Sequence, residues 1–415
     1  EILEGGVLMI KFFKRTIVIV GAIAAILTMG SVASAGEYVY GSWIAAKHGV
    51  NQDGLLPFFK AVEKETGGSV KWKLLAGGQL VSARSTLPGV RDRIADAGLV
   101  IPVFNRKELG HNNVIFDMQS FGSSPVAIAG ASTETIMRDC PECLAEYRKQ
   151  KVVYIGGFGT TAFKLICAKP ITTLAQVKGL KAHSGAGWRT WRGEHQSRHL
   201  YYQQLPQPSG RDRVKGAAAR WVKAMGGIPV FMSPVDGVTA MQRGAMTCLH
   251  GPIPWLRSYG YMDVTKSIIN YPMGTPRGLA MMALNRKVWN GLSTSEKKAM
   301  LKHFPSASAR ATLIGFMAED IKILAAAKKK GIIVVPGSKK FADLMAKHRK
   351  SELTAIPKAV KRVGVKADAA KRIMAAHVKN LTKWEKIAAE VGTDVGKVAA
   401  AFKREIYDRI DIGKM

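Results

Sequence analysis

A histidine and three glycines lie together in the segment Lys178–Gly187, which is the part of the chain best suited to hold a ligand. Its order, Lys-Gly-Leu-Lys-Ala-His-Ser-Gly-Ala-Gly, predicts a short strand, then a loop that leads into a helix. Gly185 and Gly187 permit a tight turn that exposes backbone N–H groups. Such groups before a helix favour an anion or another polar ligand. His183 and Ser184 are therefore the predicted polar contacts of a small ligand.

Four cysteines offer a second kind of chemistry. Cys140 and Cys143 have the spacing of a redox motif, but no thioredoxin-like pattern surrounds them. A local disulfide or a pair of inert thiols is favoured over catalysis, in keeping with an oxidising compartment. Cys167 and Cys248 each end an apolar, strand-like run, and the sequence leaves their pairing open.

Two further histidines, His195 and His199, are four residues apart and would share one face of a helix. No third ligand accompanies them, so a solvated loop is favoured over a metal site. They belong to the segment 189–215, which lacks periodicity and predicts an insertion or a disordered excursion. The sequence contains no nucleophile elbow, zinc-binding helix motif or phosphate loop, so we expect neither an enzyme nor a cofactor. A periplasmic enzyme stays open as the lesser alternative.

The charge balance is strongly basic, with a formal net charge of +32 over 415 residues. The lysines and arginines are spread along the chain, which favours a basic surface over a dedicated nucleic-acid site. No helix-turn-helix, zinc or RNA-recognition signature occurs, so no nucleic-acid partner is predicted. A basic envelope protein that binds polyanions through charge alone stays open as an alternative.

The first methionine, Met9, is followed by basic residues and then by an apolar run from Thr16 to Met29. Ala33-Ser-Ala35 follows as a cleavage signal. This order predicts that residues 1–35 contain a secretory signal peptide and that the protein functions in the periplasm. A retained N-terminal anchor is the alternative.

The length predicts more than one core. A strand, turn, helix and strand succeed one another over residues 70–101, and the same order returns over 228–249. We therefore expect two α/β lobes with mixed sheets. Residues 36–160 would form most of lobe I, residues 161–280 most of lobe II with the insertion at 189–215, and residues 281–415 the connecting and C-terminal helices that return to lobe I.

Local patterns support this division. Val70 and Trp72 alternate with lysines, which predicts a strand with one buried face. Ser233 is a plausible helix cap, and Ser293 with Glu296 forms a capping-box signature. In the segment 162–168 the residues Phe163, Leu165 and Cys167 would share one face of a strand and Lys164 and Ile166 the other, and this segment is the predicted crossing from one lobe to the other.

Five short stretches resemble the periplasmic solute-binding subunits of tripartite ATP-independent periplasmic (TRAP) transporters, of the dicarboxylate-binding type. They are Ala76–Leu80, Gly89–Gly98, Lys178–Lys181, Arg220–Val230 and Ala240–Ala245. The resemblance implies a periplasmic-binding-protein-like fold of type II, with two lobes joined by crossing strands and a long helix. It also implies a non-enzymatic receptor that closes on a small organic solute, a carboxylate, and delivers it to a membrane permease. A monomer and a homodimer both stay open.

The sequence departs from the family where the ligand would bind. An arginine of the family that clamps the ligand carboxylate corresponds to His183, and a second basic contact corresponds to Phe163. Histidine lacks the planar fork of arginine and is charged only conditionally near neutral pH. The expected pocket therefore has less fixed charge and more aromatic surface.

The predicted ligand-binding residues follow from these departures. Trp43, Phe163 and Trp255 are expected as aromatic walls of the cleft, although ordinary core packing would also account for them. His183 and Ser184 would orient the ligand, with Lys164 as a charge partner. An ordinary hydrogen-bonded histidine is the alternative for His183.

Overall fold

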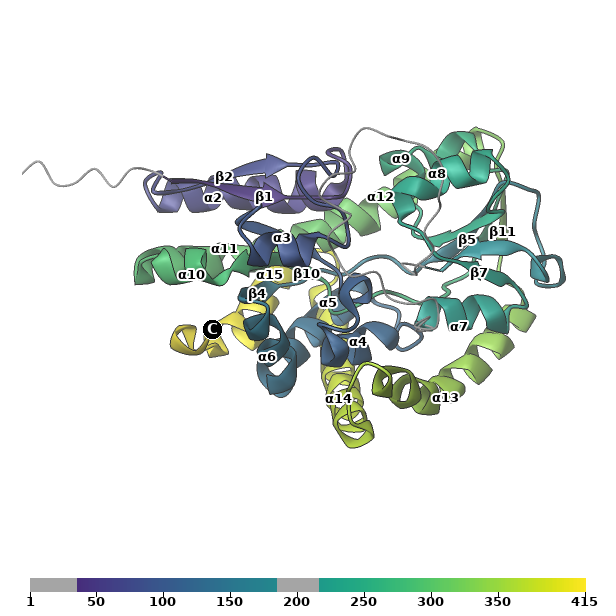
Figure 1. Cartoon of the computed structure of the whole chain (residues 1–415). Coiled ribbons are helices and arrows are strands. Elements are labelled where there is room, and N and C mark those ends of the chain that lie inside the picture. Colours follow the sequence, from purple (N-terminus) through teal and green to yellow (C-terminus); the bar gives the residue numbers. More distant parts are fainter. Residues whose placement is uncertain (1–35, 185–215) are drawn as a thin grey trace, which may run out of the picture.

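The computed structural model describes residues 36–184 and 216–415, and it contains two β-sheets, each at the centre of one lobe (Figure 1). The first sheet has the order β2-β1-β3-β10-β4. Its strands are β1 (Gly36–Gly41), β2 (Val70–Leu75), β3 (Ala97–Val100), β4 (Val152–Gly156) and β10 (Ala280–Asn285). β1 runs parallel to β2 and β3, whereas β10 is antiparallel to β3 and β4. The predicted α/β fold with mixed sheets is confirmed.

The second sheet has the order β11-β9-β5-β8-β6-β7. Its strands are β5 (Lys164–Cys167), β6 (Lys181–His183), β7 (Ile228–Val230), β8 (Cys248–Gly251), β9 (Ser267–Asn270) and β11 (Ile333–Pro336). β5 is antiparallel to both of its neighbours, whereas β6 is parallel to β7 and β8. His183 is the last residue of β6.

The chain passes between the sheets several times. One connection joins β4 to β5, and a second joins β9 to β10. A helical connection follows, formed by α11 (Thr294–Thr312), the π-helical turn η7 (Leu313–Ala318) and α12 (Glu319–Lys329). In Figure 1, α11 lies in the first lobe and α12 points toward the second. The space between the sheets is therefore bordered by several connecting segments.

Helices cover both faces of the first sheet. They are η1 (Val50–Leu55), α2 (Leu56–Glu65), α3 (Thr86–Arg91), η2 (Pro102–Asn105), α4 (Gly110–Asp117), α5 (Pro125–Glu134), η3 (Thr135–Asp139), α6 (Pro141–Lys149), α10 (Arg286–Gly291), α14 (Ala367–Val391), α15 (Val395–Glu405), η8 (Tyr407–Arg409) and η9 (Ile412–Lys414). Around the second sheet lie η4 (Ala175–Val177), α7 (Ala217–Ala224), α8 (Pro234–Gln242), α9 (Trp255–Ser258) and η6 (Tyr261–Asp263). The long helix α13 (Lys339–Lys361) begins in the core of the second lobe and ends in the core of the first, where it contacts α4 and α14.

Several local predictions are confirmed by the contacts that shape these elements. Val70 and Trp72 are buried in β2 while the intervening lysines are exposed. The Ser233 side chain accepts a hydrogen bond from the Asp236 N–H at the start of α8. Ser293 and Glu296 form a complete capping box at the start of α11, which satisfies backbone donors that the helix leaves unpaired.

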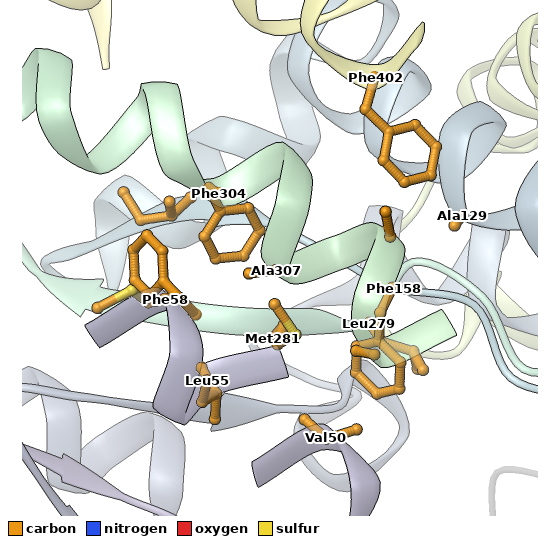
Figure 2. Packing of buried hydrophobic residues seen from close by; sticks show 14 of the residues in the cluster. Val50, Leu55, Phe58, Ala129, Phe158, Leu279, Met281, Phe304, Ala307 and Phe402 are labelled. Carbon is orange, nitrogen blue, oxygen red and sulfur yellow. The ribbon is translucent and has the colours of Figure 1, made fainter. Parts of the chain in front are cut away.

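The core of the first lobe lies between its sheet and the helices α2, α5, α11 and α15 (Figure 2). Phe58 packs edge to face against Phe304, with 5.4 Å between the ring centroids. Val50, Phe158 and Leu279 belong to the same cluster and also line the space between the lobes. The core of this lobe thus continues into the wall of the cleft.

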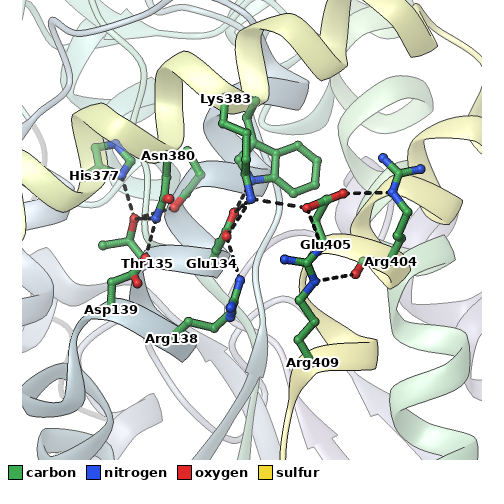
Figure 3. Close-up of polar contacts among 12 residues, drawn as sticks. Glu134, Thr135, Arg138, Asp139, His377, Asn380, Lys383, Arg404, Glu405 and Arg409 are labelled. Atoms are coloured by element: carbon green, nitrogen blue, oxygen red, sulfur yellow. Dashed lines mark hydrogen bonds and ion pairs between the residues drawn. The ribbon is translucent and has the colours of Figure 1, made fainter.

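The C-terminal helix α14 is attached to α5 by a polar network around Glu134 (Figure 3). The Glu134 carboxylate accepts hydrogen bonds from Lys383 Nζ at 2.6 Å and from Trp384 Nε1 at 2.6 Å, and Arg138 binds it at 3.0 Å. Lys383 also lies 3.5 Å from Glu405 of α15. The network fixes the returning C-terminal helices to the first lobe.

All four cysteines are paired. Cys140 and Cys143 form a local disulfide at the start of α6, in line with one of the two interpretations that the sequence favoured. Cys167 and Cys248 face each other on the antiparallel strands β5 and β8 and form the second disulfide. Across residues 36–184 and 216–415, no helix combines the length and the apolar character needed to cross a membrane.

Several predictions concern residues that the structure does not describe. The proposed signal peptide in residues 1–35 and the insertion at 189–215 lie outside the described residues. The same holds for the loop glycines Gly185 and Gly187 and for His195 and His199.

Candidate functional site

A cavity lies between the two lobes, and residues from both sheets and from the connecting helices line it. Its free space is ≈ 820 Å³ when the part open to solvent is included, and the centre of a water molecule can occupy ≈ 90 Å³ of it. Since one water needs roughly 10–15 Å³ by this measure, the cavity accommodates roughly six to nine water-sized groups. This is the size of a small organic molecule.

The second lobe contributes an aromatic wall to the cavity. The Phe163 and Trp255 ring centroids are 5.4 Å apart, and Tyr259 lies 5.6 Å from Trp255. Trp255 rests against Gly251, because a Cβ atom added there would lie 2.6 Å from the indole ring. Phe163 and Trp255 were both predicted as cleft-wall aromatics, and the structure brings them into contact.

The first lobe supplies the facing wall. The indole Nε1 of Trp43 donates a hydrogen bond to the Leu99 carbonyl at 3.1 Å, and its ring meets Phe104 edge to face at 5.5 Å. Both rings line the cavity. Trp43 therefore belongs to the hydrophobic core and to the cavity wall at once, so the two sequence interpretations of this residue do not exclude each other.

His183 and Ser184 lie at the end of β6 and line the cavity, as predicted. Burial lowers the pKa of His183 below its ordinary value, although contacts with the His250 and Met232 carbonyls oppose this shift. Nδ1 lies 3.2 Å from the His250 oxygen, and Nε2 lies 3.1 Å from the Met232 oxygen. Both ring nitrogens are thus occupied by the protein, and His183 is less available as a cation near neutral pH than the sequence suggested.

Lys164 does not line the cavity. It directly follows Phe163, and successive side chains of an extended chain point to opposite sides. Burial lowers the pKa of Lys164, and the nearby Asp320 carboxylate opposes this shift. The expectation that Lys164 pairs with ligand charge is therefore not supported by its position.

The described lining contains no lysine, arginine, aspartate or glutamate. Its polar members are His48, Gln119, Thr160, His183, Ser184 and Tyr259. Within residues 36–184 and 216–415, the other side chains that line the cavity are apolar, and one lining residue is a glycine. This composition agrees with the expectation of a pocket poor in fixed charge and rich in aromatic surface. Within the same described ranges, no group of three or more His, Cys, Asp or Glu side chains is placed to hold a metal ion.

A buried ion cluster connects the lobes beside the cavity. Asp117 at the end of α4 accepts hydrogen bonds from Arg106 Nη1 at 3.1 Å and Nη2 at 2.7 Å. Burial opposes ionisation of Asp117, but Arg106 and Arg220 outweigh it and hold the pKa of the carboxyl below its ordinary value. Arg220 of α7 also binds Glu352 of α13 through two hydrogen bonds, from Nε at 2.7 Å and from Nη2 at 2.5 Å. The cluster positions the first turn of α7, which lines the cavity through Ala217 and Ala218.

Sequence reasoning did not single out several residues of the site. His48 precedes η1 and Tyr259 follows α9, and neither was predicted to contact a ligand. Phe316 belongs to η7 and also lines the cavity, although it was not predicted to do so. Gly49 and Gly315 let these segments meet, because a Cβ on Gly49 would lie 2.4 Å from the Gly315 backbone. A pair of glycines so far apart in the sequence gave no signal of this approach.

No protein-family profile and no curated relative matches the sequence. Solved structures do match in fold. A marine metagenome TRAP solute binding protein specific for aromatic acid ligands, in complex with 3-hydroxybenzoate, has a TM-score of 0.68 and 16% identity, over 84% of this chain and 99% of that chain. A Bordetella pertussis extracytoplasmic solute receptor binding pyroglutamic acid has a TM-score of 0.64 and 15% identity, over 83% of this chain and 100% of that chain.

A TRAP periplasmic solute binding protein from Bordetella bronchiseptica with bound (R)- and (S)-mandelate has a TM-score of 0.63 and 18% identity. That similarity covers 84% of this chain and 99% of the other. Each of these likenesses covers nearly the whole of the compared protein. The chain therefore has the two-lobe fold of the TRAP solute-binding proteins, as the sequence resemblance predicted.

Proposed function

We propose that this chain is a periplasmic receptor that captures a small organic acid between its two lobes and delivers it, chemically unchanged, to a TRAP-type membrane permease. The observation that carries the proposal is the cavity between the lobes, lined by aromatic rings from both. The fold of the chain, which is that of TRAP solute-binding proteins, supports the same function.

We infer that the ligand is a compact acid with a ring. The aromatic wall of Phe163, Trp255 and Trp43 favours a flat or apolar face. The three similar proteins bind 3-hydroxybenzoate, pyroglutamic acid and mandelate, each of which combines one carboxyl group with a ring. Within residues 36–184 and 216–415 the lining carries no formal charge, which favours ligands with a single carboxylate over dicarboxylates, because each additional buried charge would need a partner.

A ligand screen tests the proposal. The purified protein is heated with each member of a panel of aromatic, alicyclic and aliphatic acids that includes 3-hydroxybenzoate, mandelate and pyroglutamate. A ligand that binds only the folded state raises the melting temperature by mass action. We expect a rise with ring-containing monocarboxylates and the identification of such an acid by mass spectrometry of the protein as purified. A complete lack of response to the panel, with no co-purified compound, would refute capture.

A matched pair of variants locates the binding. Ala218 is buried at the cavity, so Ala218→Phe places a ring into the ligand space and should abolish the rise in melting temperature. Ala342 is exposed on α13, and Ala342→Phe adds the same ring away from the cavity. The control should respond to ligand like the wild type. An equal response of both variants would place the binding elsewhere.

A further inference from the structure

Two polar side chains from opposite lobes meet at the cavity. His48 precedes η1 in the first lobe, and Tyr259 follows α9 in the second. Their ring centroids are 5.8 Å apart, and both side chains line the cavity. Phe316 packs against the other side of His48 at 5.5 Å, and Trp255 packs against Tyr259. Apolar neighbours thus hold both rings in place at the cavity wall.

The hydrogen bonds of His48 define which of its nitrogens carries the proton. Nδ1 accepts a hydrogen bond from the Val50 N–H at 3.2 Å, so the proton of the neutral ring lies on Nε2. Burial, together with the nearby Arg257, lowers the pKa of His48 to about 3, which keeps the ring neutral at pH 7. Nε2–H has no hydrogen-bond partner among residues 36–184 and 216–415. His48 therefore offers one neutral donor.

The Tyr259 hydroxyl is a second donor without a partner. Its oxygen is shielded from solvent, and no group in the described part of the chain hydrogen-bonds to it. Burial raises the pKa of Tyr259 well above its ordinary value, so the hydroxyl keeps its proton. The neighbouring Tyr261 differs, because its hydroxyl donates to the Pro234 carbonyl at 2.6 Å. Buried polar groups are nearly always satisfied, so a buried hydroxyl that has no partner among the described residues, on a side chain that lines a ligand-sized cavity, is suited to bind a ligand.

We propose that His48 and Tyr259 are specificity-determining residues that donate hydrogen bonds from the two lobes to oxygen atoms of the bound ligand. This inference rests on the proposed function and deepens it. The ligand is then a small ring-containing acid whose carboxylate, carbonyl or hydroxyl oxygens are held by uncharged donors. A ligand that engages both residues also joins the lobes, because each donor belongs to a different one.

The test uses the full-length protein and whichever of 3-hydroxybenzoate, mandelate and pyroglutamate the wild type binds. Tyr259→Phe keeps the ring and removes the hydroxyl. His48→Asn keeps an acceptor for the Val50 N–H and removes the Nε2 donor. Each variant should bind the compound about 5- to 30-fold more weakly in calorimetric titration, the loss expected for one hydrogen bond to a buried acceptor.

Tyr147→Phe is the matched control, because the Tyr147 hydroxyl is also buried and unpartnered in the described structure but lies in the core beside Cys143. It should leave the affinity within twofold of the wild type. The ligand-free Tyr259→Phe variant should melt at or above the wild-type temperature, since it loses an unsatisfied hydroxyl. A merely structural role would instead lower this temperature together with the affinity.

Two negative outcomes are distinguishable. If the wild type binds one of the compounds, and the affinities of Tyr259→Phe and His48→Asn for it are both within twofold of the wild-type affinity, this inference is wrong and the proposed function stands. If the wild type binds none of the acids in the full panel, the proposed function is wrong and the inference falls with it.

Discussion

The carboxylate of Asp117 accepts a hydrogen bond from the backbone N–H of Ala217 at 3.3 Å, and this contact joins the two lobes at the cavity. Asp117 ends α4 in the first lobe, whereas Ala217 begins α7 in the second and lines the cavity. Asp117 is completely buried, and Arg220 of α7 approaches the same carboxylate at 3.6 Å. The wall of the cavity formed by α7 is therefore positioned by a charge of the opposite lobe.

Asp117→Asn should destabilise the protein strongly. The amide can still accept from Ala217, but the buried Arg106 guanidinium loses its counter-charge, and removing one partner of a buried pair costs about 3 kcal/mol or more. Denaturant titration measures the change in the free energy of unfolding. Asp343→Asn is the control, because the Lys339–Asp343 pair is exposed and should contribute less than about 0.5 kcal/mol. Equal effects of the two substitutions would contradict the role of the cluster.

Gly251→Ala should weaken ligand binding more than it affects folding. The added methyl group would lie 2.6 Å from the Trp255 ring, so the indole must move out of the cavity wall. We expect at least about a tenfold loss of affinity, the scale of a displaced aromatic contact. Gly291→Ala serves as control, since nothing lies within 4 Å of its added methyl group. Calorimetric titration of both variants with the ligand identified by the screen measures the two affinities. An equal affinity of the two variants would contradict the prediction.

Buried neutral histidines should make the protein sensitive to acid. The pKa of His48 and that of His250 are each lowered to about 3, mainly by burial. Below pH 6.5, the ordinary pKa of histidine, these side chains therefore take up protons in the unfolded chain but not in the folded protein. The resulting stability is fully present above pH 6.5 and is lost as the pH falls toward the folded pKa.

Each such histidine should contribute a slope of up to about 1.4 kcal/mol per pH unit to the free energy of unfolding below pH 6.5. Urea unfolding at pH 7, 6 and 5 measures the slope, and His48→Asn should reduce it. A stability that is constant from pH 7 to pH 5 would show that these rings are not held neutral.

Ligand affinity should respond to pH through His183. An anionic ligand favours the protonated ring and so raises the pKa of His183 in the complex. Burial holds the pKa of His183 in the free protein under 6.5, and below that pKa the gain in affinity is fully present. The gain disappears as the pH rises through the pKa that His183 has in the complex. We expect binding of an organic acid to strengthen below pH 6.5 and His183→Gln to flatten this profile. An unchanged pH profile in the variant would show that protonation of His183 does not contribute to ligand affinity.

The two disulfides should differ in their contribution to stability. The Cys167–Cys248 bond closes a loop with a sequence separation of 81, whereas Cys140–Cys143 spans a separation of 3. In the chain-entropy description, replacing the first pair by alanine costs about 4 kcal/mol and replacing the second about 2 kcal/mol. Denaturant titrations of the two double variants test this order. A larger loss for the short loop would contradict it.

Much of the local structure could be predicted because it depends on neighbours in the sequence. Ser293 and Glu296 cap α11 as expected, since both partners belong to the same helical turn. The alternation in β5 is also confirmed, with Leu165 and Cys167 in one core cluster and Ile166 in another. Strand bounds were less accurate. The second strand–turn–helix–strand segment was expected to end at residue 249, but its last strand is β8, Cys248–Gly251, because the register of β8 is determined by pairing with β5 and β6.

The site was only partly predictable. Trp43, Phe163, His183, Ser184 and Trp255 were proposed from the sequence, and the structure places all five along one cavity. Lys164 was also proposed, but the alternation of the extended chain turns it away. His48 and Tyr259 were missed, because a solitary histidine in a turn and a tyrosine after a short helix have no local signature of binding.

The sequence by itself determined the order of many strands and helices and that two α/β lobes form, because periodicity, caps and turn residues act over a few neighbouring positions. Only the tertiary structure decided the charge of His183, the pairing of Cys167 with Cys248 and the meeting of His48 with Tyr259. These properties depend on burial and on contacts between segments far apart in the chain. Burial removes water from ionisable groups, and sheet pairing selects which distant residues face one another.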